Sequence, residues 1–302
     1  MPHTHDCGVI YPTDEITPSS LPLISHSDYT MTGNVTRKPN GKVAIVTGAA
    51  QGIGAAIATR LAHDGFDVVI ADLKSADAKA TAVAKTCEAA GARAAVIPVD
   101  VRSEEDVGAL VAATVEQLGR VDVMVANAGI GPPVDFLETT TRTMNDLWEI
   151  NIRGVMYCYQ AAARQMIKQG DGGRLIAASS IAGLTGFPQL GMYSASKFAV
   201  RGLNQCAAAE LGKYGITCNT YNPGVVQTDM WTGLDKFYSG RAGAPDGSAL
   251  AAQAAANPMR RNTDAAEVAN SVSLRIGSES VYFGESSCSG GQSGCGGGQQ
   301  MH

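Results

Sequence analysis

The stretch TGAAQGIG, residues 47–54, decides the fold. It follows an apolar run rich in β-branched residues, KVAIVT (42–47), and leads into a segment with helical spacing, IGAAIATRLAHDG (53–65). A glycine-rich turn between a strand and a helix is typical of dinucleotide-binding proteins, because the free N–H groups that begin the helix face the phosphates. The spacing is GxxxGxG rather than the usual GxGxxG, so the flanking strand and helix carry much of this prediction.

Each residue of this turn has an expected task. Gly48 allows the tight turn, Gly52 lets the backbone approach a pyrophosphate, and Gly54 lets helix and strand pack closely. Gln51 is neutral at a place where a basic side chain could bind an extra phosphate. Ile53 completes the predicted cofactor-binding turn. A plain tight turn without a ligand is the weaker alternative, because it does not account for the strand and helix on either side.

The alternation of short apolar strands and helical segments continues downstream. Further strands are predicted at 67–72, 93–100, 121–129, 174–180 and 216–222, and helices at 76–91, 103–119 (with Ser103 as N-cap), 141–168 and 193–213. The strands barely alternate in polarity, which indicates a parallel sheet covered on both faces. We therefore predict an α/β fold: a single doubly wound (Rossmann) parallel sheet with helices on both faces and ligands at the carboxyl ends of the strands.

Composition divides the chain into regions. Residues 1–38, rich in Pro, Ser and Thr, are predicted to be a disordered tail. Its HTHDC motif (3–7) could bind a metal, but a solvated tail is favoured and no metal site is predicted. Residues 39–283 are predicted to form the catalytic domain, with 223–264 as a candidate lid over the site. Residues 284–302 are a glycine-rich tail.

Charge and cysteine content narrow the classes of partner. The net charge of −5 argues against nucleic acid or an anionic membrane surface, and no run of eighteen apolar residues predicts a membrane span. The seven cysteines are odd in number and form no CxxC pair, so we expect reduced thiols and a cytoplasmic location. A small-molecule substrate is the expected partner.

Asp72 ends the second predicted strand, eighteen residues after Gly54. A carboxylate at this place can accept both hydroxyls of an adenosine ribose, and it would repel a 2′-phosphate. The position therefore predicts NAD as the cofactor rather than NADP. An aspartate that only caps a helix or loop stays an open alternative.

The stretch YSASK, residues 193–197, places a phenol and an ammonium one helical turn apart. Tyr193 and Lys197 lie about 40° apart around a helix axis and so share one face. A free phenol titrates near pH 10, and a nearby cation lowers that pKa. This spacing can be an ordinary surface pair, but it can also serve proton transfer in a hydride-transfer reaction.

Several motifs together resemble the short-chain dehydrogenase/reductase family over about residues 40–275. They occur in the family's order and spacing: TGAAQGIG (47–54), ANAG (126–129), Asn151 in WEINIRG, SS (179–180), YSASK (193–197) and NPGVVQT (222–228). Independent agreement of several motifs makes the resemblance specific.

The resemblance implies a role for each matched residue. Tyr193 would be the catalytic acid/base, Ser180 would hold the substrate oxygen, and Lys197 would bind the nicotinamide ribose and lower the tyrosine pKa. Asn151 would anchor a water in the proton relay. Ser179 competes for the serine role, which the family spacing gives to Ser180. The remaining implied cofactor contacts are Asp100 and Val101 beside the adenine, Asn127, Ala128 and Gly129 below the cofactor, and Val226 and Thr228 near the nicotinamide.

The sequence around YSASK and NPGVVQTDMW looks closest to the acetoin/diacetyl reductase and 2,3-butanediol dehydrogenase branch. The resemblance implies NAD-dependent reduction of a small ketone by a homo-oligomer, a tetramer or a dimer. The expected substrate pocket consists of Ser180, Ile181, Phe187, Met192 and Trp231, although Ile181 and Phe187 can also be ordinary core. The alternatives are another carbonyl or polyol substrate, or an NAD-binding regulator without turnover.

The C-terminus departs from the family pattern. After AAEVANSV (265–272) the family continues to a valine-rich final strand, whereas this chain ends in SGGQSGCGGGQQMH (289–302). Glycine-rich composition weakens a strand. Since that strand packs near a subunit interface in the family, the departure puts oligomer assembly in question and leaves the catalytic positions untouched.

Overall fold

The computed structural model describes residues 40–277 and 286–288, all within the unit Thr36–His302. The predicted tail at 1–38, with its HTHDC motif, lies outside the described residues. So does the glycine-rich tail at 284–302, apart from residues 286–288.

The core of the fold is a seven-stranded sheet in the order β3-β2-β1-β4-β5-β6-β7, and all its pairings are parallel. The strands are β1 (Val43–Thr47), β2 (Asp67–Asp72), β3 (Ala94–Pro98), β4 (Val123–Ala126), β5 (Gly173–Ala178), β6 (Ile216–Pro223) and β7 (Ser286–Cys288). The chain runs outward from β1 to β3 and then from β4 to the opposite edge. This order confirms the doubly wound prediction and places the switch point between β1 and β4, where such sheets bind ligands.

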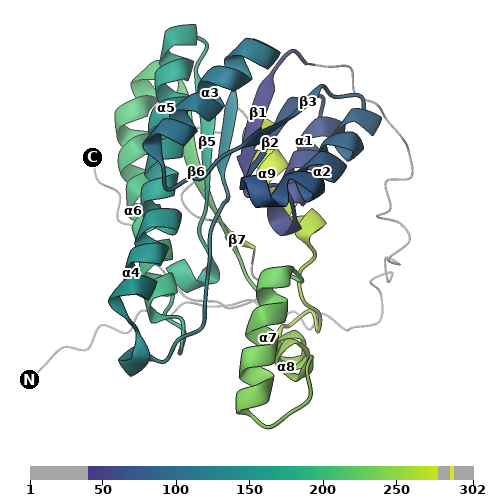
Figure 1. The fold of residues 1–302 in the computed structure, drawn as a ribbon, viewed down its shortest axis with the longest axis vertical. Helices are drawn as coiled ribbons and strands as arrows, with labels where there is room; N and C mark the ends of the chain where they lie inside the picture. Colours follow the sequence, from purple (N-terminus) through teal and green to yellow (C-terminus); the bar gives the residue numbers. More distant parts are fainter. Residues whose placement is uncertain (1–39, 278–285, 289–302) are drawn as a thin grey trace, which may run out of the picture. The chain divides into compact units, whose positions relative to one another are not determined.

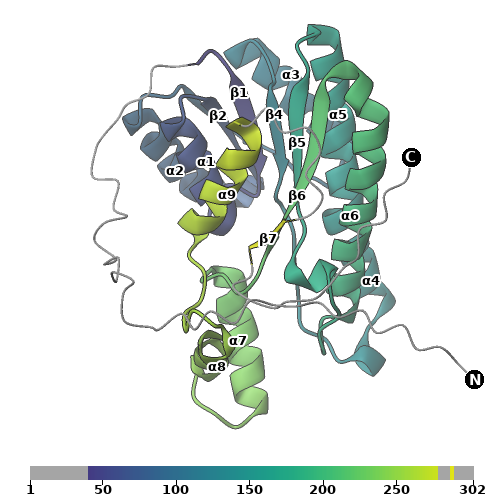
Figure 2. The same ribbon diagram turned by 180° about the vertical axis from the view of Figure 1, so that it is seen from behind.

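Helices cover both faces of the sheet (Figures 1 and 2). On one face lie α1 (Gly52–His63), α2 (Asp77–Ala89) and α9 (Ala265–Gly277); on the other lie α3 (Glu104–Leu118), α5 (Gly154–Gln169) and α6 (Gly191–Leu211). Alternate strand residues serve the two cores: Ile45 packs with α3 and α5, whereas Val46 packs with α1 and α2. Burial on both faces explains why the strands read as continuous apolar runs.

The start of α3 follows the prediction. Ser103 is the N-cap, and its hydroxyl accepts a hydrogen bond of 3.1 Å from the Asp106 N–H. This bond satisfies one of the backbone donors that a helix start leaves free.

Two features of the elements were not predicted. The single helix expected at 141–168 is divided into α4 (Thr141–Leu147), a π-helical turn (Trp148–Arg153) and α5. A seventh strand, β7, was not predicted; it pairs with Tyr221–Pro223 despite its glycine-rich surroundings. Three residues of backbone pairing form this strand, so it needs no apolar sequence pattern.

The candidate lid region, 223–264, folds into α7 (Asp229–Arg241) and α8 (Ser248–Ala256), which pack on each other beyond the carboxyl end of β6 (Figure 1). Asp235 of α7 fixes the start of α8. Its carboxylate accepts a hydrogen bond of 2.8 Å from the Leu250 N–H and another from the Gly247 N–H. The two helices therefore form one braced unit.

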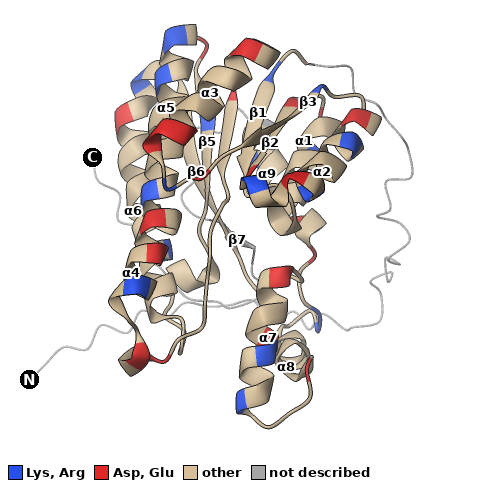
Figure 3. Cartoon of the chain, in the orientation of Figure 1, with Lys and Arg blue, Asp and Glu red and all other residues tan. Residues whose placement is uncertain are grey.

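Surface charge and thiols agree with the composition. Blue and red residues are intermixed on the outer helices, and the strands are largely tan (Figure 3). Among the residues that the structure describes, no helix is long and apolar enough to cross a membrane. Cys87, Cys158, Cys206 and Cys218 are free cysteines.

Candidate active site

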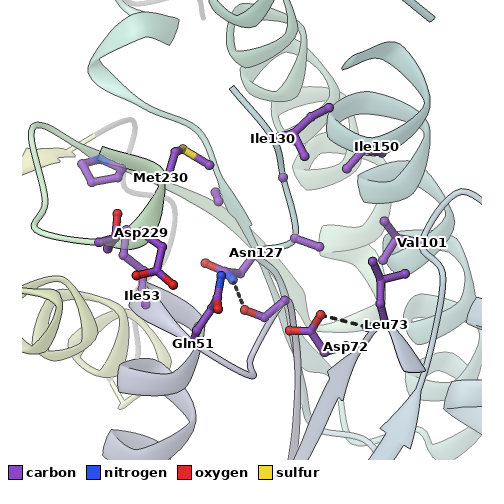
Figure 4. A pocket seen from close by; sticks show the side chains of 18 of the residues that line it. Gln51, Ile53, Asp72, Leu73, Val101, Asn127, Ile130, Ile150, Asp229 and Met230 are labelled. Atoms are coloured by element: carbon purple, nitrogen blue, oxygen red, sulfur yellow. Dashed lines mark hydrogen bonds between the residues drawn. The ribbon is translucent and has the colours of Figure 1, made fainter. Parts of the chain in front are cut away.

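A cavity of about 450 Å³ lies at the carboxyl ends of the strands, over the switch point. Figure 4 shows Gln51, Asn127 and Asp72 directed into it, with Asp229 and Met230 approaching from α7. Its lining includes nearly all the residues predicted to bind the cofactor: Gly48, Gln51, Gly52, Ile53, Gly54, Asp72, Asp100, Val101, Asn127, Ala128, Gly129, Tyr193, Lys197 and Thr228.

The glycine turn forms the floor of this first cavity. Gly48 and Gly52 have φ of +63° and +57°, a region that favours glycine. A Cβ at Gly54 would lie 2.6 Å from Asn127 Nδ2 and closer still to the Gly48 carbonyl oxygen. The predicted close packing of helix and strand is therefore present, and side chains at these positions would disrupt it.

Asn127 joins the turn to the end of β4. Its Nδ2 donates to the carbonyl oxygens of Thr47 (2.8 Å) and Gly48 (3.1 Å). Its Oδ1 accepts from the Tyr221 hydroxyl at 2.7 Å. These hydrogen bonds of Asn127 stabilise the conformation of the glycine turn at the floor of the cavity.

The start of α1 suits an anion. Within the described part of the chain, no side chain caps α1 at Gln51, and the first turn carries no acidic residue. A helix start of this kind presents free N–H groups and the positive end of the helix dipole. With the glycine floor, it makes a cradle that fits a pyrophosphate.

Asp72 lies at the rim of the same cavity. Its Oδ2 accepts a hydrogen bond from the Ala50 N–H (2.9 Å), and its Oδ1 accepts one from the Leu73 N–H (2.8 Å). The carboxylate therefore braces the turn, as the capping alternative expected, and also faces the cavity. An ionised carboxylate has about four acceptor sites, so it can also accept from ribose hydroxyls.

Asp100 and Val101 lie at the far side of the first cavity, with Arg102. The Asp100 carboxylate pairs with the Arg102 guanidinium at 2.5 Å. Hydrogen bonding by Arg102 lowers the pKa of Asp100 from its ordinary value. The side chain of Arg102 was not predicted as part of the site.

Tyr193 and Lys197 lie on one face of α6, as their spacing predicts. Lys197 Nζ is 5.6 Å from the centroid of the Tyr193 ring and donates to the Ala178 carbonyl oxygen at 2.9 Å. A Cβ at Gly129 would be 3.3 Å from Lys197 Nζ. The ammonium group is thus held between β5 and the loop after β4, beside the cavity.

The two serines after β5 have different tasks. The Ser179 hydroxyl donates to the Lys197 carbonyl oxygen at 3.0 Å, so it anchors α6 to the sheet. The Ser180 hydroxyl lies beside the Tyr193 phenol, whose pKa it lowers through a hydrogen bond. This geometry favours Ser180 for contact with a substrate oxygen, in agreement with the family spacing.

Asn151 lies in the π-helical turn and is fully buried. Its Oδ1 accepts from the Ile130 N–H at 2.9 Å, and its Nδ2 donates to the Ile130 carbonyl (2.9 Å) and the Ser196 hydroxyl (3.0 Å). The side chain therefore ties the loop after β4 to the YSASK helix. π-Helical turns occur frequently at functional sites.

Burial changes the pKa values of the central pair. It lowers the pKa of the Lys197 ammonium to about 8. It raises the pKa of the Tyr193 phenol, and the Ser180 hydrogen bond only partly opposes this. Burial therefore outweighs the lowering of the Tyr193 pKa that its spacing to Lys197 predicts, because burial disfavours phenolate and ammonium alike.

A second cavity of about 380 Å³ adjoins the first. Tyr193, Ile53, Pro223, Thr228 and Met230 line both cavities. Three further residues of the predicted substrate pocket, Ile181, Phe187 and Trp231, line the second cavity with Ser180. The phenol therefore lies where the two cavities meet.

The sequence matches a known protein family over most of the described residues. A family model described as short chain dehydrogenase matches residues 42–239, which contain every predicted catalytic and cofactor-binding residue. The chain belongs to the short-chain dehydrogenase family. It is 45% identical over 196 residues to a short-chain dehydrogenase/reductase of Armillaria gallica, covering 65% of this chain and 75% of the relative.

Two further relatives cover more of the chain. An L-2,3-butanediol dehydrogenase of Corynebacterium glutamicum is 39% identical over 80% of this chain and 93% of the relative. The crystal structure of an NAD⁺-bound xylitol dehydrogenase superposes with a TM-score of 0.78 at 30% identity, over 84% of this chain and 100% of that one. The predicted family and fold are thus confirmed, and the chain is an oxidoreductase of the short-chain dehydrogenase family.

Two predicted contacts of this short-chain dehydrogenase lie elsewhere. Met192 does not line the second cavity, because it is one residue and so about 100° around α6 from Tyr193. Val226 lines the second cavity and not the first, whereas Thr228 lines both.

Lys79 is a residue that the sequence-based reasoning missed. From α2 its Nζ donates to Gln51 Oε1 at 2.6 Å and lies 3.7 Å from Asp229 Oδ2. A positively charged side chain therefore lies beside the neutral Gln51 at the edge of the first cavity. It is 28 residues away from Gln51 in sequence, and no local pattern marks it.

Proposed function

We propose that this short-chain dehydrogenase reduces a small ketone, diacetyl or acetoin, with NADH. The observation that carries the proposal is the position of Tyr193 at the junction of a glycine-floored dinucleotide cavity and a largely apolar second cavity. The relationship to an L-2,3-butanediol dehydrogenase supports a small vicinal ketone or alcohol as the substrate.

In this proposal a bound nicotinamide dinucleotide supplies the hydride. Ser180 holds the ketone oxygen, and the Tyr193 hydroxyl gives its proton to that oxygen as the carbonyl carbon gains the hydride. The products are an alcohol and oxidised cofactor, and solvent returns the proton to Tyr193. Lys197 binds the nicotinamide ribose, and Asn151 keeps the YSASK helix in register with the loop below the cofactor and anchors a water for the proton relay.

The raised pKa of the Tyr193 phenol agrees with its proposed role as the proton donor in ketone reduction. Burial keeps the Tyr193 phenol protonated, which is the form that donates a proton. The reverse reaction needs the phenolate as a base, so it is expected to require higher pH or the positive charge of an oxidised nicotinamide.

NADH is proposed over NADPH because the Asp72 carboxylate lies at the cavity rim, where it would repel a 2′-phosphate. Lys79 opposes this preference, but its ammonium is engaged with Gln51 and Asp229. We therefore propose that the kcat/KM is higher with NADH than with NADPH and that NADPH is still used.

We propose a homo-oligomer, since apolar side chains on the π-helical turn, α5 and α6 are exposed, among them Trp148 (55%), Met156 (40%) and Phe198 (44%). The free thiols support a cytoplasmic location.

The test is NADH oxidation with the purified protein against diacetyl, acetoin, xylulose and an acetoacetyl thioester. Turnover of diacetyl and acetoin is expected. Turnover confined to xylulose would favour a polyol dehydrogenase, a second candidate that the similarity to a xylitol dehydrogenase supports. Absence of turnover with every ketone would contradict the proposed function.

A further inference from the structure

The second cavity extends along α7. Trp231, Leu234 and Tyr238 line it, and their i, i+3, i+7 spacing places them on one face of the helix. With a rise of 1.5 Å per residue, seven residues give a wall about 10 Å long. The cavity is therefore elongated in the direction of α7.

The two ends of this wall differ. At one end Met230 and Thr228 line both cavities, so this end belongs to the reaction centre. At the other end the Tyr238 hydroxyl donates to the Pro188 carbonyl oxygen at 3.1 Å. The three carbon–carbon bonds of diacetyl have a contour of only about 4.6 Å. A four-carbon diketone at the reaction centre therefore leaves the Tyr238 end of the wall without contact.

Helix α8 forms the rim at the far end. Ala249, Ala252 and Gln253 line the cavity from one face of this helix. Two of the three side chains are single methyl groups, so they leave the space in front of Leu234 and Tyr238 open. Ala252 is itself exposed, which places it at the solvent edge of the cavity.

We infer that the enzyme accepts vicinal diketones longer than four carbons, with the apolar chain lying along α7 in the space that the small side chain of Ala252 on α8 leaves open. The inference rests on the proposed ketone reduction and adds to it a class of longer, apolar substrate. Burial of each further methylene against Trp231 and Leu234 contributes about 0.8 kcal/mol, or about a fourfold gain in kcat/KM.

The test compares diacetyl with 2,3-hexanedione in the wild-type protein, in Ala252→Trp and in Ala251→Trp. Ala251 lies on the opposite face of α8 and does not line the cavity, so it is the matched control. Wild type and Ala251→Trp are expected to favour 2,3-hexanedione, which has two further methylenes, over diacetyl by about fifteenfold in kcat/KM. Ala252→Trp is expected to lose this advantage, so that its kcat/KM for 2,3-hexanedione falls toward its kcat/KM for diacetyl.

Three results would contradict this inference, and only the last of them would also contradict the proposed function. Reduction of diacetyl with no gain for 2,3-hexanedione in wild type would overturn the inference and leave ketone reduction standing. Equal loss with both diketones in Ala252→Trp would also overturn it, because the residue would then not act on chain length. No reduction of either diketone by wild type would overturn the proposed function and the inference with it.

Discussion

Gly54→Ala tests the dinucleotide cradle through a change of one methyl group. The added Cβ would lie 2.6 Å from Asn127 Nδ2, against an ordinary contact of 3.4 Å or more, and would press harder still on the Gly48 carbonyl oxygen. The start of α1 must therefore move by roughly 0.8 Å or more. Overpacking of this kind costs about 1–3 kcal/mol, which lowers Tm by about 2–12 °C for a domain of this size.

The displacement has a larger effect on cofactor binding. A hydrogen bond of about 2.9 Å from an N–H at the start of α1 to a phosphate oxygen would lengthen by the same amount. It would then fall outside the range of effective bonding. Loss of one charge-assisted bond to a phosphate removes about 1.5–3 kcal/mol. The Kd for NADH, measured by fluorescence titration, is therefore expected to rise by at least about tenfold.

Gly108→Ala is the matched control. Gly108 is exposed within α3, and a Cβ there would meet nothing within 4 Å. Alanine is about 0.5–1 kcal/mol better than glycine inside a helix, so this variant should be slightly more stable and bind NADH normally. An unchanged Kd in Gly54→Ala, or equal effects in both variants, would refute the role assigned to the glycine floor.

Three further predictions concern charge. Asp72→Ser should narrow the preference for NADH over NADPH by about tenfold in kcat/KM, since one repulsive charge is removed; an unchanged ratio would show that Asp72 does not contact the ribose. Lys197 has its pKa lowered to about 8 by burial, so the folded protein releases this proton above pH 8 while the unfolded chain keeps it to near pH 10.4. Wild type should therefore gain unfolding free energy relative to Lys197→Met between pH 8 and 10 in urea titrations, and a constant difference would contradict the burial of the ammonium. Asp135→Asn removes the 2.6 Å ion pair with Arg241 that links α7 to the loop after β4. KM for diacetyl should rise about threefold at low salt and by less at about 0.5 M NaCl, as for an exposed pair; a salt-independent change would exclude this ion pair as the cause.

Periodicity predicted most of the fold because the strands are buried on both faces. The six apolar runs from 42–47 to 216–222 all became parallel strands. The π-helical turn within 141–168 was not predicted. Its Asn151 bonds to Ile130, 21 residues away in sequence, and no local pattern marks that contact. Strand β7 was also not predicted. It forms through backbone pairing with β6, and no side-chain pattern in the sequence indicates it.

The site was predictable where local spacing determines geometry. The glycine turn, Ser180 and the Tyr193–Lys197 pair all follow from motif spacing. Lys79 was beyond reach, because only the packing of α2 against α1 brings it to Gln51. The pKa of Tyr193 was also beyond reach, since the spacing to Lys197 shows the nearby cation and not the burial that opposes it.

The central claim is that the Tyr193 hydroxyl donates the proton to the ketone. Stopped-flow measurement of NADH oxidation in Tyr193→Phe, with the Kd for NADH determined on the same preparation, tests it most directly. Loss of one general acid is expected to slow the chemical step by about 10²–10⁴-fold, with NADH binding nearly unchanged because the ring remains. A rate within tenfold of wild type at normal NADH affinity would contradict the claim.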